Sequence, residues 1–297
     1  MSAFLEFSKK YKPVVESSLD KYLTSEETYP QTIHKAMRYS ISAGGKRLRP
    51  LLTMAASQLA CGEVEPVLPT ACAMEIIHTY SLIHDDLPCM DNDDFRRGKP
   101  TLHKVTSEAI AVLAGDALLT FAFELIAANA EIEGVIKANI PDVIKEIAIA
   151  AGSLGMVGGQ TVDIELEGKE FDVPTLQYLH THKTGALITA SLTSGALLVS
   201  KSPKIYNSLK KYGHKIGLAF QIVDDILDIT SDQETLGKTV MKDIHAKKAT
   251  YPAVFEVEES RKLAQELLKE AKHEIKSFGE KADVLSSLAD YILERTY

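Results

Sequence analysis

The stretch AIAVLAGDALLTFAFELIAANA, residues 109–130, decides the fold of this chain because it is apolar on almost every side. Its apolar residues recur at spacings of three and four, which is typical of an α-helix, and it lacks the strict alternation of a half-buried strand. It is long enough to cross a bilayer, but it contains Asp116 and Glu124, which are expensive in lipid. We therefore predict a helix buried in the middle of a large helical bundle.

The rest of the chain follows the same helical period, and residues 185–199 and 216–229 are also apolar on nearly every face. None of the breaks between the expected helices is long and rich in Gly, Ser or Pro, as a flexible linker would be. We predict one all-α domain over residues 1–297, a bundle of about ten or more helices. The expected helices are 3–22, 31–43, 50–60, 69–87, 106–130, 141–161, 174–199, 205–231, 248–276 and 281–294.

Composition indicates a soluble globular protein. Hydrophobic residues make up 45% and charged residues 25% of the 297, which is ordinary usage, and the net charge of −8 argues against a non-specific nucleic-acid binder. The three cysteines, Cys61, Cys72 and Cys89, form no CxxC pair, so neither a disulfide framework nor a zinc module is indicated. The N-terminal residues 1–20 contain no apolar run of signal-peptide length. We expect a cytoplasmic protein without a membrane span.

Aspartates gather in two places, each at the end of an apolar run. The segment LIHDDLPCMDNDDFRRGKP, residues 82–100, and the segment FQIVDDILDI, residues 220–229, contain them. A single DD pair is most often a helix cap or a solvated face, but the recurrence weakens that interpretation. Oxygen-rich clusters suit Mg²⁺, which prefers carboxylates, water and phosphate oxygens. The aspartates are Asp85, Asp86, Asp91, Asp93 and Asp94 in the first segment and Asp224, Asp225 and Asp228 in the second.

The first cluster requires a break in its helix. Asp91 follows Asp85 by six residues, which on an unbroken helix would point it about 120° away. Pro88 disrupts helical hydrogen bonding and disfavours helical geometry at Leu87. We predict that the helix breaks at 87–90 and that Asp91 turns back toward the metals, while Asp93 and Asp94 are loop or cap residues.

Basic residues lie near both clusters. The segment AGGKRLRP, residues 43–50, places cations directly after two glycines, which can wrap an anion, although an exposed basic turn is the simpler alternative. P-loop spacing is absent. Arg96 and Arg97 either neutralise the acidic loop or bind phosphate in a bidentate manner. Together, the acids and cations describe a site for two phosphorylated substrates.

These motifs resemble the short-chain trans-prenyltransferases, specifically the bacterial-type farnesyl diphosphate synthases. The resemblance covers most of the chain and is carried by GGKRLRP, IHTYSLIHDDLPCMDNDDFRRGKPTLH, LAGDALLT, GMVGGQ, HKTGAL, AFQIVDDILD and the later GK…D…KATYP. It implies an all-α fold around a deep central cavity, a homodimer and three Mg²⁺ ions between the two aspartate motifs.

The resemblance also implies a role for each matching residue. The metal ligands would be Asp85, Asp86, Asp91, Asp224, Asp225 and Asp228; the isopentenyl diphosphate ligands Lys46, Arg49, His78 and Arg97; the allylic diphosphate ligands Arg96, Lys183, Lys238 and Lys248; and the groups beside the reacting carbon Thr184 and Gln221. The last motif departs from the family pattern at Met241, Lys242 and Lys247, which leaves open whether Lys247 or Lys248 has the allylic role.

The implied reaction is a Mg²⁺-dependent condensation of isopentenyl diphosphate with dimethylallyl and geranyl diphosphate, through ionisation to an allylic carbocation. Helical spacing nominates Ser81 and Ile77 as the residues below Asp85 that limit product length. The resemblance singles out Tyr80, where an aromatic residue goes with farnesyl diphosphate. The alternatives are a geranylgeranyl diphosphate synthase, a terpene cyclase and a non-catalytic prenyltransferase subunit. A divalent-cation buffer is disfavoured because EF-hand spacing is absent.

Overall fold

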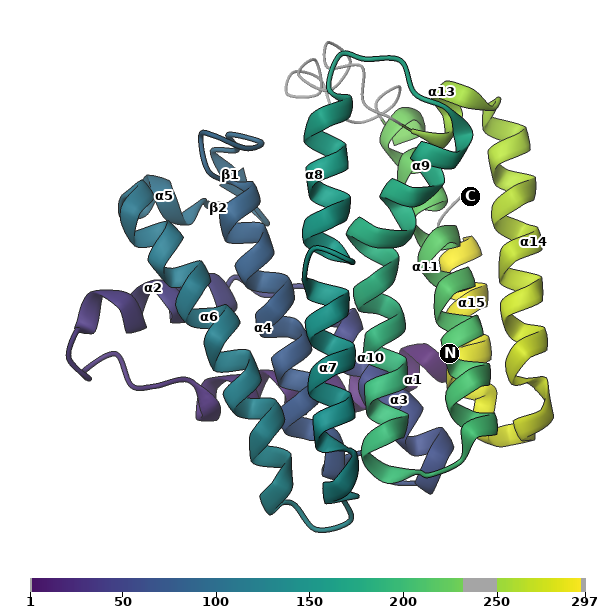
Figure 1. The fold of residues 1–297 in the computed structure, drawn as a ribbon, viewed down its shortest axis with the longest axis horizontal. Helices are drawn as coiled ribbons and strands as arrows, with labels where there is room; N and C mark the ends of the chain where they lie inside the picture. Colours follow the sequence, from purple (N-terminus) through teal and green to yellow (C-terminus); the bar gives the residue numbers. More distant parts are fainter. Residues whose placement is uncertain (1, 232–249, 295–297) are drawn as a thin grey trace.

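The computed structural model describes residues 2–231 and 250–294, which form a bundle of α-helices with one small hairpin (Figure 1). The predicted all-α fold is confirmed. The α-helices are α1 Ala3–Tyr22, α2 Gln31–Ile41, α3 Leu48–Cys61, α4 Leu68–Asp85, α5 Leu102–Val105, α6 Glu108–Ala128, α7 Ile140–Ala151, α8 Met156–Leu166, α9 Val173–His180, α10 Ala186–Val199, α11 Pro203–Ser231, α13 Tyr251–Val254, α14 Val257–Ile275 and α15 Asp283–Glu294. Short 3₁₀ turns cover Glu65–Val67, Asn129–Glu131, Lys137–Asn139 and Lys276–Ala282.

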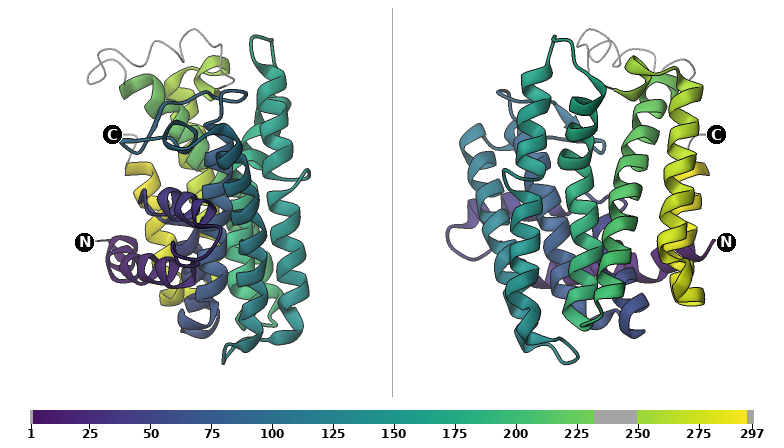
Figure 2. Two further views of the ribbon diagram at one scale, coloured as in Figure 1. Left: turned by 90° about the vertical axis from the view of Figure 1, so that its left-hand side faces the viewer. Right: turned by 45° about the vertical axis from the view of Figure 1, so that its right-hand side comes forward.

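Helix α10 lies in the middle of the bundle and packs against α3, α7 and α11 (Figures 1 and 2). Nearly all of its residues are buried, as the sequence predicted for 185–199. Gly195 allows its close approach to α3, because a Cβ there would lie 2.2 Å from the carbonyl oxygen of Thr53. This central helix continues from the segment that carries Lys183 and Thr184, so its packing fixes where those side chains lie.

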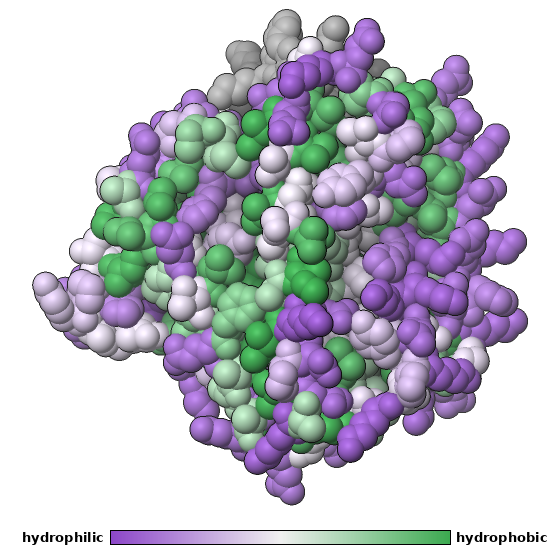
Figure 3. Space-filling view, in the orientation of Figure 1, coloured by the Kyte–Doolittle hydropathy of each residue, from purple (hydrophilic) through white to green (hydrophobic). Residues whose placement is uncertain are grey.

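Helix α6 is less buried than its composition predicted. One face packs against α4 through Ala111, Ala114 and Leu118, but Val112 is 40% exposed and Leu113 is 54% exposed on the other. By length and composition, Glu108–Glu131 is the one stretch of the described residues that could cross a membrane. Hydrophobic side chains gather over α6, α7 and α8 on the face shown in Figure 3. The prediction of a helix buried on all sides is therefore wrong for one face.

Two expected helices are interrupted. The predicted helix 141–161 is two helices, α7 and α8, and the chain bends between Gly152 and Gly155, where a Cβ on Gly155 would lie 2.1 Å from the carbonyl oxygen of Ala150. The predicted helix 174–199 contains one π-helical turn, Thr181–Gly185, between α9 and α10. Such turns are found mostly at functional sites, where they change the direction of the side chains that follow.

The first aspartate cluster lies at the end of α4, followed by a short loop and a hairpin. The helix ends at Asp85, two residues before the predicted break, and the backbone N–H of Asp91 donates to the carbonyl oxygen of Asp85 at 2.9 Å. The turn back toward Asp85 is confirmed. The sequence did not predict the hairpin, in which β1 (Phe95–Arg96) pairs with β2 (Lys99–Pro100) across two residues of positive φ, Arg97 at 54° and Gly98 at 76°.

Candidate active site

A cavity of about 330 Å³ opens where α4, α8 and the π-helical turn meet. Its volume lies within the range of small-molecule sites. Charged side chains contribute part of the lining, namely Arg49, Asp85 and Lys183. Much of the rest of the lining is apolar. The remaining lining residues are His78, Tyr80, Ser81, Leu82, His84, Met90, Met156, Val157, Gln160, Thr161, Ile164 and Thr184. The cavity can therefore take a ligand that has an anionic group and a hydrocarbon body.

Asp85 is the acid of the first cluster that faces this cavity. Burial raises the pKa of its carboxyl to about 6, opposed by Lys183 and reinforced by the neighbouring charge of Asp91. A carboxylate in this setting is stabilised by any added cation.

Asp86, in contrast, is occupied by a protein partner. The Nε–H of Arg96 donates to Asp86 Oδ1 at 2.6 Å, and Arg96 also lies 3.5 Å from Asp93 Oδ2. Asp86 is buried, and burial raises the pKa of its carboxyl while this guanidinium lowers it. Of the two sequence interpretations of Arg96, its contacts here are those of a neutraliser of the acidic loop. Asp94 contacts Lys104 at 2.7 Å, so Asp93 and Asp94 are loop residues, as predicted.

The buried acid of the second cluster is Asp225 on α11, and both of its carboxylate oxygens are engaged. Gln221 Nε2–H donates to Oδ1 at 3.0 Å, the backbone N–H of Tyr251 donates to Oδ2 at 3.0 Å, and His180 Nε2 lies 3.1 Å from Oδ2. Asp225 thus ties α11 to α9 and α13. Asp224, half-buried, and Asp228, exposed, lie one turn apart on the same helix.

The π-helical turn joins this network to the cavity. Thr184 donates its hydroxyl hydrogen to Gln221 Oε1 at 2.9 Å, and Gln221 in turn holds Asp225. Lys183 Nζ lies 2.5 Å from Asp163 Oδ2 on α8. The structure therefore brings Thr184 and Gln221 together, and the π-helical turn carries both Lys183 and Thr184.

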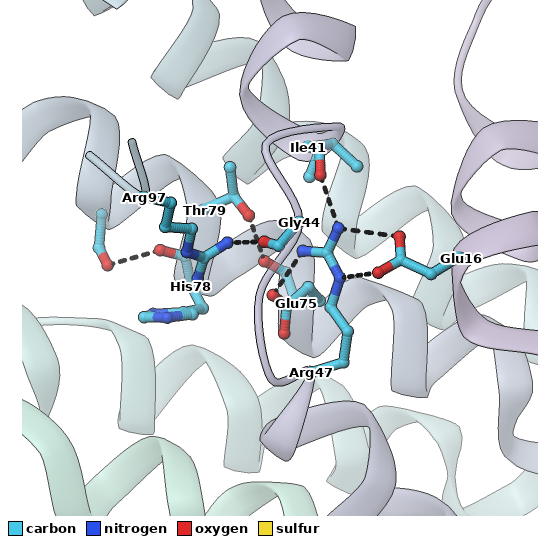
Figure 4. Close-up of polar contacts among 9 residues, drawn as sticks. Glu16, Ile41, Gly44, Arg47, Glu75, His78, Thr79 and Arg97 are labelled. Atoms are coloured by element: carbon cyan, nitrogen blue, oxygen red, sulfur yellow. Dashed lines mark hydrogen bonds and ion pairs between the residues drawn. The ribbon is translucent and has the colours of Figure 1, made fainter. Parts of the chain in front are cut away.

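Arg47 and Arg97 lie beside the Gly-Gly segment (Figure 4), and the nearby Arg49 lines the cavity. The guanidinium of Arg97 donates to the carbonyl oxygen of Gly44 and packs on Gly45, where a Cβ would lie 2.6 Å from Arg97 Nη1. Only glycine fits there, because Gly45 also has φ +138°. Arg49 Nε is buried and has no hydrogen-bond partner.

The electrostatics of this group favour an added anion. Burial lowers the pKa of the Arg49 guanidinium, partly offset by Glu75, and the repulsion of Arg97 lowers it further. Burial and the charges of Arg49 and Arg97 hold the pKa of His78 well below its usual range. Positive charge is thus concentrated beside the cavity beyond what Glu75 can balance, and a diphosphate would relieve it.

Arg47, which the sequence did not single out as a ligand, anchors the Gly-Gly segment from below (Figure 4). Its guanidinium is completely buried and makes four hydrogen bonds, two to Glu16 at 2.9 and 3.0 Å, one to Glu75 Oε1 at 2.8 Å and one to the carbonyl oxygen of Ile41 at 2.6 Å. Arg47 has φ +52° and precedes the first residue of α3. It therefore holds the turn between Lys46 and Arg49 in place.

Tyr80 and Ser81 both line the cavity, whereas Ile77 is completely buried and is not part of its lining. Tyr80 is buried, with 6% of its surface exposed, and burial together with the charge of Asp85 raises the pKa of its phenol to about 12. Tyr80 and Asp85 thus line the same cavity although helical spacing separates the two residues by about 140°. Ser81 donates its hydroxyl hydrogen to the carbonyl oxygen of His78 at 2.9 Å.

Some predicted residues do not enter this assembly. Lys238 and Lys248, with Met241, Lys242 and Lys247, lie outside the described residues. Lys46 is exposed at the edge of the Gly-Gly segment. Over residues 2–231 and 250–294, no three His, Cys, Asp or Glu side chains converge on one point.

The sequence interpretation missed the partners that orient the functional groups. Asp163, Glu75, His180 and Tyr251 are examples. Each comes from an element distant in sequence, so spacing carries no signal for the pairing. Glu75 alone had a local signal, because it is an acid in the middle of the apolar run that leads to the first aspartates.

Comparisons with known proteins agree on one family. The family described as Polyprenyl synthetase matches residues 30–288. A dimethylallyltranstransferase of Fischerella ambigua is 51% identical over 95% of this chain and 81% of its own, and a geranylgeranyl diphosphate synthase of Cyanophora paradoxa is 49% identical over 98% and 96%. The apo crystal structure of an FPP/GFPP synthase from Zymomonas mobilis superimposes with a TM-score of 0.87 at 39% identity, covering 98% of both chains.

Proposed function

Because the chain belongs to the polyprenyl synthetase family, we propose that it extends allylic diphosphates with isopentenyl diphosphate and stops at farnesyl diphosphate. Prenyl diphosphate synthesis is the activity that the relatives' names share. The observation that carries the finer proposal is the cavity itself, which has cations and Asp85 in its lining together with apolar side chains and the buried Tyr80.

Two groups of cations support two diphosphate positions. Arg49 and Arg97, with Lys46 and His78 beside them, would hold isopentenyl diphosphate, and the unpartnered Nε of Arg49 is a donor available for it. Lys183 also lines the cavity and would hold the allylic diphosphate together with Arg96, Lys238 and Lys248. Arg96 would have to share its guanidinium between Asp86 and that phosphate.

Mg²⁺ fits the carboxylates of the two aspartate clusters, because it prefers oxygen ligands. Asp85, whose pKa is raised by burial and by Asp91, would be stabilised by an added cation, and Asp91, Asp224 and Asp228 would complete the set around the diphosphate. Asp225 fits less well as a direct ligand, since both of its oxygens are already engaged, and we assign it the task of orienting α11. Bound Mg²⁺ supplies positive charge that stabilises a departing diphosphate.

The chain's own residues then control the reactive end of the substrate. Lys183 balances the diphosphate as the allylic C–O bond breaks. Thr184 commits its hydroxyl hydrogen to Gln221, so its oxygen lone pairs are available to stabilise positive charge at the reacting carbon. The double bond of isopentenyl diphosphate attacks that carbon, and a proton is lost to the departing diphosphate. Apolar side chains of the lining, the buried Met156 among them, exclude water, which would otherwise trap the cation as an alcohol.

In this proposal, Tyr80 sets the length of the product. Its buried ring lines the same cavity as Asp85 and would block a longer chain, so replacement by Ala would enlarge the cavity. We expect C15 product from the native protein and from Tyr80→Phe, which keeps the ring, and C20 or longer product from Tyr80→Ala. The assay is chromatography of products made from labelled isopentenyl diphosphate and geranyl diphosphate.

A geranylgeranyl diphosphate synthase is the second candidate. It is favoured by the name of the Cyanophora paradoxa relative, which is 49% identical to this chain. A dominant C20 product from the native protein would select this candidate and refute the role of Tyr80. A non-catalytic subunit would give no extension at all.

The assembly and location are also part of the proposal. We infer a cytoplasmic homodimer, since a second copy can cover the exposed apolar side chains of Val112 and Leu113 on α6, Ile149 on α7 and Val157 on α8, and the three cysteines are free thiols. Light scattering is expected to give twice the 32.5 kDa of one chain, and Leu113→Glu is expected to halve that mass. A native mass of one chain would contradict the dimer.

A further inference from the structure

His84 lies between the first aspartate cluster and the cavity but has no part in the proposed chemistry. It precedes Asp85 on α4, and its ring reaches across to α6. Its Nε2 lies 3.1 Å from the carbonyl oxygen of Val112, within hydrogen-bond distance. A Cβ on Gly115 would lie 2.1 Å from the same nitrogen, so the imidazole fills a notch on α6 that only glycine provides.

The other contact of this ring is with Tyr80, one turn earlier on α4. The two ring centroids are 5.8 Å apart and the planes meet at 80°, the edge-to-face arrangement that aromatic pairs favour. Both side chains line the cavity. Because the imidazole is held against Val112 and Gly115, it presents a fixed edge to the phenol ring, and α6 thereby restricts where Tyr80 can move.

We propose that His84, seated in the Gly115 notch, is a positioning residue that fixes Tyr80 as the floor of the cavity and so sets product length. The inference rests on the proposed function, in which Tyr80 is that floor. It assigns a purpose to the glycine of the LAGDALLT segment, residues 113–120. Loss of the imidazole leaves a gap into which the phenol can swing, and the cavity then accepts a longer chain.

The test measures the ratio of C20 to C15 product for the native protein, His84→Ala, Tyr80→Ala and the double variant. His84→Ala is expected to raise the ratio about threefold to tenfold, the range that one aromatic pair contact allows. The double variant is expected to match Tyr80→Ala, because His84 acts through the phenol ring. His273→Ala, an exposed histidine on α14, is the matched control and is expected to leave the ratio unchanged.

Gly115→Ala is an independent test that leaves His84, the residue next to Asp85, unchanged. The added methyl group displaces the imidazole, so the ratio is expected to shift at least threefold, and this variant decides the question if His84→Ala is inactive or unfolded by circular dichroism. An unchanged ratio in Gly115→Ala and His84→Ala, with a raised ratio in Tyr80→Ala, overturns the role of His84 and leaves the floor in place. Additive effects in the double variant overturn it as well. Absence of any extension by the native protein refutes the proposed function and this inference together.

Discussion

Replacing Arg47 by methionine tests whether the buried arginine organises the isopentenyl diphosphate side of the site. The substitution keeps an unbranched side chain of similar length but removes four hydrogen bonds. Glu75, with 2% of its side chain exposed, is left as a buried carboxylate without its ion-pair partner, whereas Glu16 is 38% exposed and can be solvated. Breaking a buried pair from one side costs about 3–5 kcal/mol, and nearly all of that cost here arises at Glu75.

The assay is urea unfolding combined with steady-state kinetics. Arg47→Met is expected to lower the free energy of unfolding by about 3–5 kcal/mol and to raise the KM for isopentenyl diphosphate more than that for the allylic substrate, since Arg47 holds the turn before Arg49. Lys272→Met is the matched control. It breaks a surface pair with Asp290 and is expected to change the free energy of unfolding by less than about 1 kcal/mol.

The double variant Arg47→Met, Glu75→Gln identifies the cause of the loss. If an unpaired buried charge is responsible, neutralising Glu75 recovers at least about 1–2 kcal/mol of the free energy of unfolding. A loss below about 1 kcal/mol in Arg47→Met, or no recovery in the double variant, would refute this electrostatic account of the segment.

Three other perturbations follow from the same contacts. Gly45→Ala places a methyl group against the Arg97 guanidinium and is expected to raise the KM for isopentenyl diphosphate while the kcat changes less, as measured by initial rates. Burial raises the pKa of Tyr212 well above its usual range, so above pH 10 the unfolded chain loses the phenol proton first and the free energy of unfolding falls as the pH rises. Tyr212→Phe is expected to make this fall less steep by about 1.4 kcal/mol per pH unit, as measured by alkaline denaturation. An unchanged pH dependence would contradict the burial of a neutral phenol at this position. A chelator is expected to abolish chain extension and added Mg²⁺ to restore it, whereas full activity in the chelator would exclude a metal role for Asp85.

The sequence predicts the helices because burial imposes their period. Helix α1 begins and ends where expected, and α10 is buried over nearly all of its length as its composition implied. The sequence pattern does not predict where a helix is interrupted. The interruption at Gly152 and Gly155 was missed because glycines within a helical pattern are tolerated, and only the structure shows how closely Gly155 approaches the backbone of Ala150.

The same distinction holds for the site. Aspartates and cations can be identified from the chain, because their crowding costs stability unless something balances it. The separate roles of these residues cannot be identified from the chain, because they depend on partners that folding brings from distant parts of the sequence. Asp225 is engaged by His180 and Tyr251, and Asp86 by Arg96, and these partners come from other elements of the fold. The exposed face of α6 could not be predicted either, because an apolar face covered by a second chain and one buried in a core have the same sequence pattern.

One measurement tests the central claim most directly. The protein is incubated with Mg²⁺, labelled isopentenyl diphosphate and either dimethylallyl or geranyl diphosphate, and the products are separated by chromatography. The account predicts labelled farnesyl diphosphate from either allylic substrate. Recovery of both substrates without any chain extension would contradict it.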